Sequence, residues 1–133
     1  MKTLLLSLAF IAFTSPGLHA ENASISATVF RKYQAAETIF QKLLAAEKAK
    51  NYDGFIADGT TELKAALTKM QFEASSDLLK PKLYAGYDMD LMGDLNQKGY
   101  EIYLFRLRFK NGGDDILSTL SLKDGKVAGI YFK

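Results

Sequence analysis

The feature that most constrains this chain is the segment Tyr100–Lys110, YEIYLFRLRFK, which is rich in aromatic and aliphatic residues. Such a segment is typical of a β-strand, and alternate side chains of a strand point to opposite faces of its sheet. At ~3.3 Å per residue this strand would be about 36 Å long, so it needs a partner of similar length. We expect its more apolar parity to face the core. That parity consists of Tyr103, Phe105, Leu107 and Phe109.

Three further segments have the composition of strands, and short turns that contain glycine separate the segments. Because such turns join neighbouring antiparallel strands, the sequence predicts a four-stranded meander. The expected strands are Tyr87–Leu95, Tyr100–Lys110, Asp115–Lys123 and Lys126–Lys133, and the expected turns are Asn96–Gly99, Asn111–Gly113 and Asp124–Gly125.

The residues before these strands have the periodicity of helices. Apolar residues, Phe30 and Phe40 among them, recur every three to four positions from Ser26 to Lys50. This spacing predicts one amphipathic helix, about 37 Å long, with its apolar face buried. We expect shorter helices after it. One covers Tyr52–Ala57, and a second begins after a cap at Thr60 or Thr61. A further one covers Gln71–Leu79 and is ended by Pro81. Helices followed by strands indicate an α+β fold, with the long helix packed on a curved four-stranded antiparallel sheet.

The first twenty residues have the pattern of a secretory signal. Lys2 precedes the largely apolar run Leu4–Phe13, which is about 15 Å long as a helix and too short to span a membrane. We expect Ser15–Gly17 to break any helix there and cleavage to follow Ala20, which leaves a single α+β domain over 21–133. The absence of cysteine fits a bacterial periplasm. The alternative interpretation of the first twenty residues is a buried N-terminal core helix.

The order of these elements resembles the nuclear-transport-factor-like superfamily, whose fold is a cystatin-like α+β cone. The resemblance rests on the long helix over Ser26–Lys50, the strand YEIYLFRLRFK and the closing segment LSLKDGKVAGIYFK, Leu120–Lys133. The stretch Asp124–Ile130 is similar to the ending of secreted, uncharacterised members. The superfamily contains both enzymes and non-catalytic modules, so the resemblance implies a cone and leaves the function open.

Composition excludes several chemistries. The chain contains no cysteine, and its one histidine, His19, would be lost on cleavage. Catalytic pairs that use histidine or cysteine, and thiolate zinc sites, are therefore excluded. The formal net charge is only +2 and the lysines are scattered, so we expect no nucleic-acid partner. We also expect no cofactor, no metal, and no titration of the kind that histidine gives between about pH 6 and 8.

Carboxylates, arginines and tyrosines remain as candidate functional groups. Asp88, Asp90 and Asp94 share one parity of their strand. In a pocket they would supply a general acid or base, but their parity is the polar one, so we expect them to face solvent. Arg106 and Arg108 would either clamp an anionic ligand or solvate the outer face of the sheet. The candidate ligand-binding residues are Tyr33, Tyr87, Tyr103, Arg106 and Arg108.

No convergent set of polar residues is evident, which favours a non-catalytic binding or interaction module. Its partner would be a small apolar ligand or an envelope protein. One alternative is a carboxylate-dependent isomerase or lyase that acts on a small apolar substrate inside the cone, and another is a structural or assembly factor of the envelope. We also expect a homodimer through the outer face of the sheet. The expected contact residues are Ile102, Leu104, Leu117, Val127 and Tyr131.

Overall fold

The computed structural model describes residues 16–133, so the apolar run of the expected signal, Leu4–Phe13, lies outside the described residues. Lys32–Lys133 form one compact unit, and the residues before Lys32 are not part of it. The first helix, α1, spans Pro16–Ala49 and begins well before the expected Ser26. Pro16 was expected to break a helix, but it is instead the first residue of one. This position suits proline, because its fixed φ is helical and its missing N–H would have no partner there.

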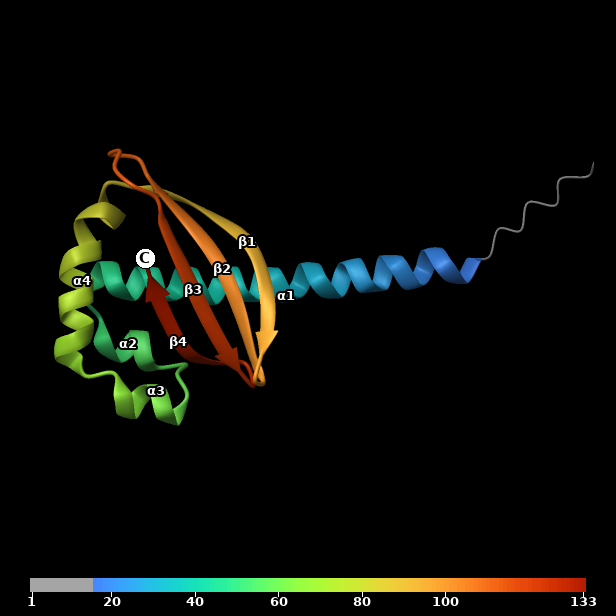
Figure 1. Cartoon of the computed structure of the whole chain (residues 1–133), viewed down its shortest axis with the longest axis horizontal. Helices are drawn as coiled ribbons and strands as arrows, with labels where there is room; N and C mark the ends of the chain where they lie inside the picture. Colours follow the sequence, from blue (N-terminus) through green and yellow to red (C-terminus); the bar gives the residue numbers. More distant parts are fainter. Residues whose placement is uncertain (1–15) are drawn as a thin grey trace, which may run out of the picture. The chain divides into compact units, whose positions relative to one another are not determined.

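Within residues 16–133, four helices precede four strands, which confirms the α+β class. The strands form one open antiparallel sheet in the order β1-β2-β3-β4 (Figure 1). After α1 come α2 (Tyr52–Ile56), α3 (Thr61–Ala66), α4 (Lys69–Tyr84), β1 (Tyr87–Gln97), β2 (Tyr100–Phe109), β3 (Ile116–Lys123) and β4 (Lys126–Phe132).

The inner face of β2 forms the centre of the core. Its inward residues Tyr103, Phe105, Leu107 and Phe109 are all buried, as the alternation predicts. The C-terminal half of α1 crosses behind the sheet (Figure 1), and the ring of Phe40 stacks on that of Phe105 at a centroid distance of 4.1 Å. Phe30 was also expected in the core, but its side chain is 62% exposed, so the buried face of α1 begins after it.

Side-chain caps fix the starts of the short helices. The Thr60 hydroxyl accepts the Leu63 N–H at the start of α3. Thr68 and Gln71 form a reciprocal capping box at the start of α4, which satisfies two backbone donors. Pro81 was expected to end this helix, but α4 continues to Tyr84. Leu83, in the last turn, is 1% exposed, and its burial offsets the hydrogen bond that the proline removes.

A β-bulge between Leu91 and Gly93 changes which side chains of β1 face the core. A bulge inserts one extra residue, so the alternation of faces slips by one beyond it. Asp94 therefore pairs with Tyr103 on the inner face, and Leu95 pairs with Ile102 on the outer face. The expectation that Asp94 faces solvent beside Asp88 and Asp90 is therefore wrong.

A second irregularity, between Ser121 and Leu122 of β3, reverses another expected face. Its partner strand β4 has Ala128 as the extra residue, so Val127 pairs with Leu122 and Gly129 pairs with Ser121. Val127 is consequently 0% exposed. The assignment of Val127 to the outer dimer face is wrong for this reason. Within residues 16–133, no helix combines the length and the apolarity that crossing a membrane requires.

Candidate binding site

A buried carboxyl group marks the candidate site. Glu47 lies near the C-terminal end of α1 and is 1% exposed. Its Oε1 accepts a hydrogen bond from the Ser75 hydroxyl of α4 at 3.2 Å. Its Oε2 has no hydrogen-bond partner among residues 16–133. A buried polar atom without a partner is costly, so this oxygen points to a binding role.

Glu47 is part of the wall of a hollow of about 520 Å³ that lies between the helices and the edge strand β4. We call it the Glu47 hollow. Phe55 and Phe72 pack together in its wall, with ring centroids 4.9 Å apart. Glu62, Gln71, Ser75 and Tyr131 add polar groups, and no lysine or arginine lines it. A small number of polar groups in an apolar cavity of this size is typical of ligand sites.

The surroundings of Glu47 change its acidity. Burial raises the pKa of the Glu47 carboxyl to about 7, and the hydrogen bond from Ser75 opposes this shift. Desolvation penalises the charged form of an acid, which accounts for the direction. The group would therefore titrate near neutral pH. The expectation of no titration between about pH 6 and 8 is wrong, because it considered only imidazole and thiol groups.

A second hollow lies along the same edge strand, closer to the C-terminus. It has a volume of about 520 Å³ and is lined by Lys82 and Lys133, together with apolar residues of α4, β3 and β4. We call it the Lys82 hollow. It shares Ser75, Ile130 and Tyr131 with the Glu47 hollow. The two hollows therefore adjoin along β4, and we call the pair of them, between β4 and the helices, the edge groove.

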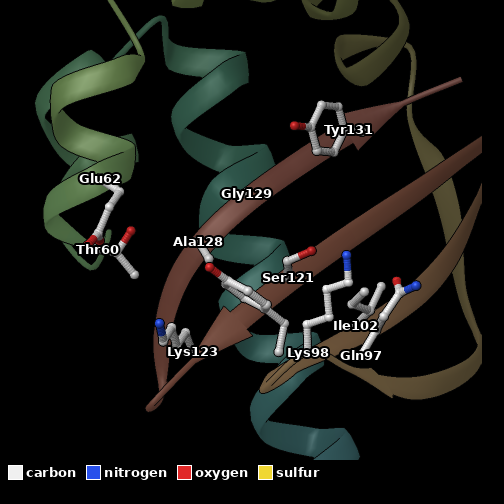
Figure 2. A pocket seen from close by; sticks show the side chains of 11 residues that line it. Thr60, Glu62, Gln97, Lys98, Ile102, Ser121, Lys123, Ala128, Gly129 and Tyr131 are labelled. Carbon is white, nitrogen blue, oxygen red and sulfur yellow. The ribbon is translucent and has the colours of Figure 1, made fainter.

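A third hollow, of about 350 Å³, lies on the outer side of the sheet and is shown in Figure 2. Thr60 and Glu62 stand beside β4 at Ala128 on one side of it, and Lys98 and Gln97 lie on the other (Figure 2). Thr60 is buried, but its hydroxyl is used to cap α3. Because this hollow contains no unpartnered buried group, the Glu47 hollow is the stronger candidate.

The three candidate tyrosines do not converge on a common cavity. The hydroxyl of Tyr33 donates to Asp94 Oδ1 at 2.7 Å, and that of Tyr103 donates to Glu101 Oε2 at 2.7 Å. Their rings meet edge to face with centroids 6.5 Å apart. Tyr87 lies at the other end of the sheet, opposite Phe109. None of the three lines the edge groove or the outer hollow.

Arg106 and Arg108 lie side by side on the outer face, where both contact one carboxylate. The Arg106 guanidinium donates to Asp90 Oδ2 at 2.9 Å, and Arg108 lies 3.1 Å from the same oxygen. The hydrogen bond from Arg106 and the nearby charge of Arg108 hold the pKa of Asp90 below its usual value. The place that an anionic ligand would take between the two arginines is therefore filled by the chain's own aspartate.

Four of the five residues expected at a dimer contact do lie on the outer face. Leu117 and Tyr131 are exposed, Ile102 and Leu104 are half-buried, and only Val127 faces inward. Leu95, which the bulge brings to this face, is also exposed. These apolar side chains are distributed over all four strands of the outer face, and we call them together the outer band.

Sequence reasoning missed Glu47 because it looked for carboxylates on the strands. A signal was present: Glu47 follows Leu43, Leu44 and Ala46, so it falls on the apolar stripe of α1. A charged residue at a core position of an amphipathic helix is a candidate for function. The second half of the site, the backbone edge of β4, depends on how the strands pair.

No protein-family model matches the chain, and no curated protein matches it. Any function assigned to this chain therefore depends on its own residues and their geometry.

Proposed function

We propose that this chain is a binding module whose ligand occupies the Glu47 hollow. One observation carries the proposal: Glu47 is 1% exposed, its Oε2 has no partner among residues 16–133, and it lines a mostly apolar hollow of about 520 Å³. A ligand with an apolar body and one hydrogen-bond donor satisfies the carboxyl and covers the aromatic wall. The hydrogen bond to the carboxyl and the covering of the aromatic wall both stabilise the complex because the hollow is shielded from water. A hydrogen bond to a carboxyl is strongest in such surroundings.

Two naphthalene probes test this proposal, because one carries a neutral donor and the other a cation. We expect 2-naphthol and 2-naphthylmethylamine to bind, with a change in naphthalene fluorescence. Ala66 lines the Glu47 hollow and Ala65 does not, so Ala66→Trp should abolish binding and Ala65→Trp should preserve it. Absence of binding to the wild type, or equal binding by both variants, would overturn the proposal.

A second candidate function is a carboxylate-dependent isomerase, favoured by the pKa of about 7 of Glu47. A carboxyl with that pKa can both accept and return a proton at neutral pH. In this function Glu47 would move a proton between two carbons of a small unsaturated ketone. 3-Cyclohexenone is a suitable probe, since its conversion to the conjugated isomer is visible in ultraviolet absorbance. We expect Glu47→Gln to remove any such conversion, and a rate that this variant leaves unchanged would refute the candidate.

We further propose that the chain is exported, with cleavage after Ala20, and that its sheet and helices form the cystatin-like cone of the nuclear-transport-factor-like superfamily. Lys2 and the run Leu4–Phe13 support export. The order of helices before a four-stranded meander supports the superfamily. The intact mass of protein from a cell-envelope fraction checks the first point: we expect a chain that begins at Glu21, and retention of Met1 would contradict it.

A homodimer through the outer band completes the proposal. Tyr131 is 67% exposed, and Leu117 is 45% exposed on the neighbouring strand. Pairing two copies of the outer band by a two-fold axis would cover these side chains. The Asp90–Arg106–Arg108 cluster lies next to Leu117, since Arg106 pairs with Leu117 in the sheet register. It would supply a polar rim for that contact.

A further inference from the structure

The free backbone edge of β4 faces the edge groove. In an antiparallel pair, residues that exchange two hydrogen bonds alternate with residues whose N–H and C=O point away. Leu117 and Lys133 exchange two such bonds, at 3.0 and 2.8 Å. Counting back along β4 from Lys133, Phe132 and Ile130 therefore direct their N–H and C=O groups away from β3, toward the edge of the sheet.

The outward groups are already paired at one point along this edge. Thr60 N–H donates to the Val127 carbonyl and Val127 N–H donates to the Asp58 carbonyl, each at 2.8 Å. The Asp58–Thr60 segment thus lies beside β4 as a one-residue parallel bridge at Gly59. The chain then turns into α3 and leaves the edge. Among residues 16–133, no backbone hydrogen bond outside the sheet involves Ile130 or Phe132.

The groove has the length of a short extended chain. The residues that line it along this edge run from Ala128 of β4 to Lys133, directly after β4, which corresponds to about 17 Å at ~3.3 Å per residue. A strand of about five residues covers that distance. In Figure 1, β4 is the edge of the sheet on the side of α3 and α4. Because α3 itself lies against β4, an added strand would lie along the part of β4 beyond α3.

The two ends of the groove differ in charge. The Glu47 hollow contains two carboxyl groups, of Glu47 and Glu62, and no basic residue. The Lys82 hollow contains Lys82 and Lys133 and no acidic residue. Neither lysine forms an ion pair in the described part of the chain. An occupant with a positive group at one end and a negative group at the other complements both hollows.

We propose that the partner of this module is an extended peptide that adds a strand to β4, with a basic side chain in the Glu47 hollow and an acidic group in the Lys82 hollow. This inference rests on the proposed binding function and specifies its ligand class. Backbone pairing with Ile130 and Phe132 supplies affinity that does not depend on sequence. The charged ends and the apolar wall at Phe55 and Phe72 select the side chains at alternate positions.

Two blocked pentapeptides test the inference: Ac-Arg-Thr-Val-Thr-Glu-NH2 and the reversed Ac-Glu-Thr-Val-Thr-Arg-NH2. In each, residues 1, 3 and 5 point to one side as an extended strand does. One order should bind and the other should bind at least tenfold more weakly, because the charged ends fix the direction. Amide hydrogen exchange at Ile130 and Phe132 should slow when the peptide is bound. Equal binding of both orders, or unchanged exchange at both amides, would overturn the inference.

Backbone methylation separates strand pairing from side-chain binding. N-methyl groups on residues 2 and 4 block one side of the peptide backbone, and those on residues 1, 3 and 5 block the other. We expect one methylated set to lose binding by more than tenfold and the other to retain most of it. Binding by both sets at the affinity of the parent peptide would exclude strand addition.

Glu47 also makes the binding of the arginine peptide depend on pH. The other titratable groups that line its hollow are Glu62 and Tyr131. Glu47 must be ionised to pair with the arginine, so affinity should fall roughly tenfold from about pH 8 to 6. Glu47→Gln should abolish this dependence, and its persistence in the variant would contradict the assigned subsite. If naphthalene probes bind but neither pentapeptide does, the peptide inference fails while the binding function stands; if neither class binds, both fail.

Discussion

At the scale of single residues, Glu47 is the position where folding and binding requirements conflict. Its carboxyl is buried among apolar side chains, and one oxygen has no partner within residues 16–133. A leucine there would extend the apolar stripe of α1 without this cost. A group that destabilises the fold and lines a cavity is characteristic of a functional site.

The pH dependence of unfolding measures this cost. The pKa of Glu47 is about 7 in the folded chain and 4.5 as an unperturbed group, so between these values the folded state binds more protons than the unfolded state. The free energy of unfolding must therefore fall as pH rises through this window. Between pH 5 and 8 we expect the free energy of unfolding of the wild type to fall by about 2.5 kcal/mol relative to that of Glu47→Gln. Urea unfolding at pH 5, 6, 7 and 8 is the measurement.

An exposed carboxyl on the wall of the same hollow provides the control for this experiment. Glu62→Gln should follow the wild-type profile, since Glu62 is exposed on α3. Parallel profiles for the wild type and Glu47→Gln would show that the Glu47 carboxyl is hydrated in solution.

At the scale of elements, the bulge in β1 determines which groups α1 meets. It turns Asp94 inward, where Lys32 Nζ donates to Oδ2 and the Tyr33 hydroxyl donates to Oδ1, both at 2.7 Å. These hydrogen bonds hold the pKa of Asp94 below its usual value. Without the bulge, the same aspartate would lie on the outer face beside Asp88 and Asp90.

Asp94→Asn tests this link between β1 and α1. The stabilisation is present above the ordinary pKa of an aspartate and is lost as pH falls through the lowered value. We expect the variant to lose roughly 1 kcal/mol of unfolding free energy near pH 7, because the pair is partly exposed to solvent. The difference from the wild type should shrink in acid. Asp88→Asn, an exposed position on the same strand, is the control and should leave stability within ~0.5 kcal/mol.

At the scale of the whole molecule, the sheet presents two surfaces with different proposed roles. We propose that the edge groove binds a peptide and that the outer band joins two copies of the chain. Tyr131 lines the groove and belongs to the outer band. Tyr131 would therefore take part in both the dimer contact and the peptide contact.

Leu104→Asp tests the dimer, because it places a charge without a partner in the middle of the proposed contact. We expect sedimentation equilibrium to show a wild-type dimer at high micromolar concentration and a monomeric variant. Ala74→Asp adds the same charge at an exposed position of α4 and should leave the dimer intact. A wild type that sediments as a monomer at that concentration would refute the outer-band contact.

The sequence by itself determined the α+β class, the order of the elements and the inward face of β2. These features follow from local periodicity: alternation specifies a strand face, and a 3.6-residue repeat specifies a helix face. Glycine-containing turns such as Asp124–Gly125 then require antiparallel neighbours. Phe105 and Leu107 are at 0% exposure for this reason.

Only the tertiary structure decided the faces beyond the bulges and the site at the edge of β4. Asp94 and Val127 point inward because an extra residue in each ladder shifts the register, and alternation within one strand contains no record of its neighbour. The pKa of Glu47 depends on residues of α4 that are far from it in sequence. The edge groove likewise exists because β4 is the last strand and α3 and α4 stand beside it, so its free backbone groups are a property of strand order, which no local pattern specifies.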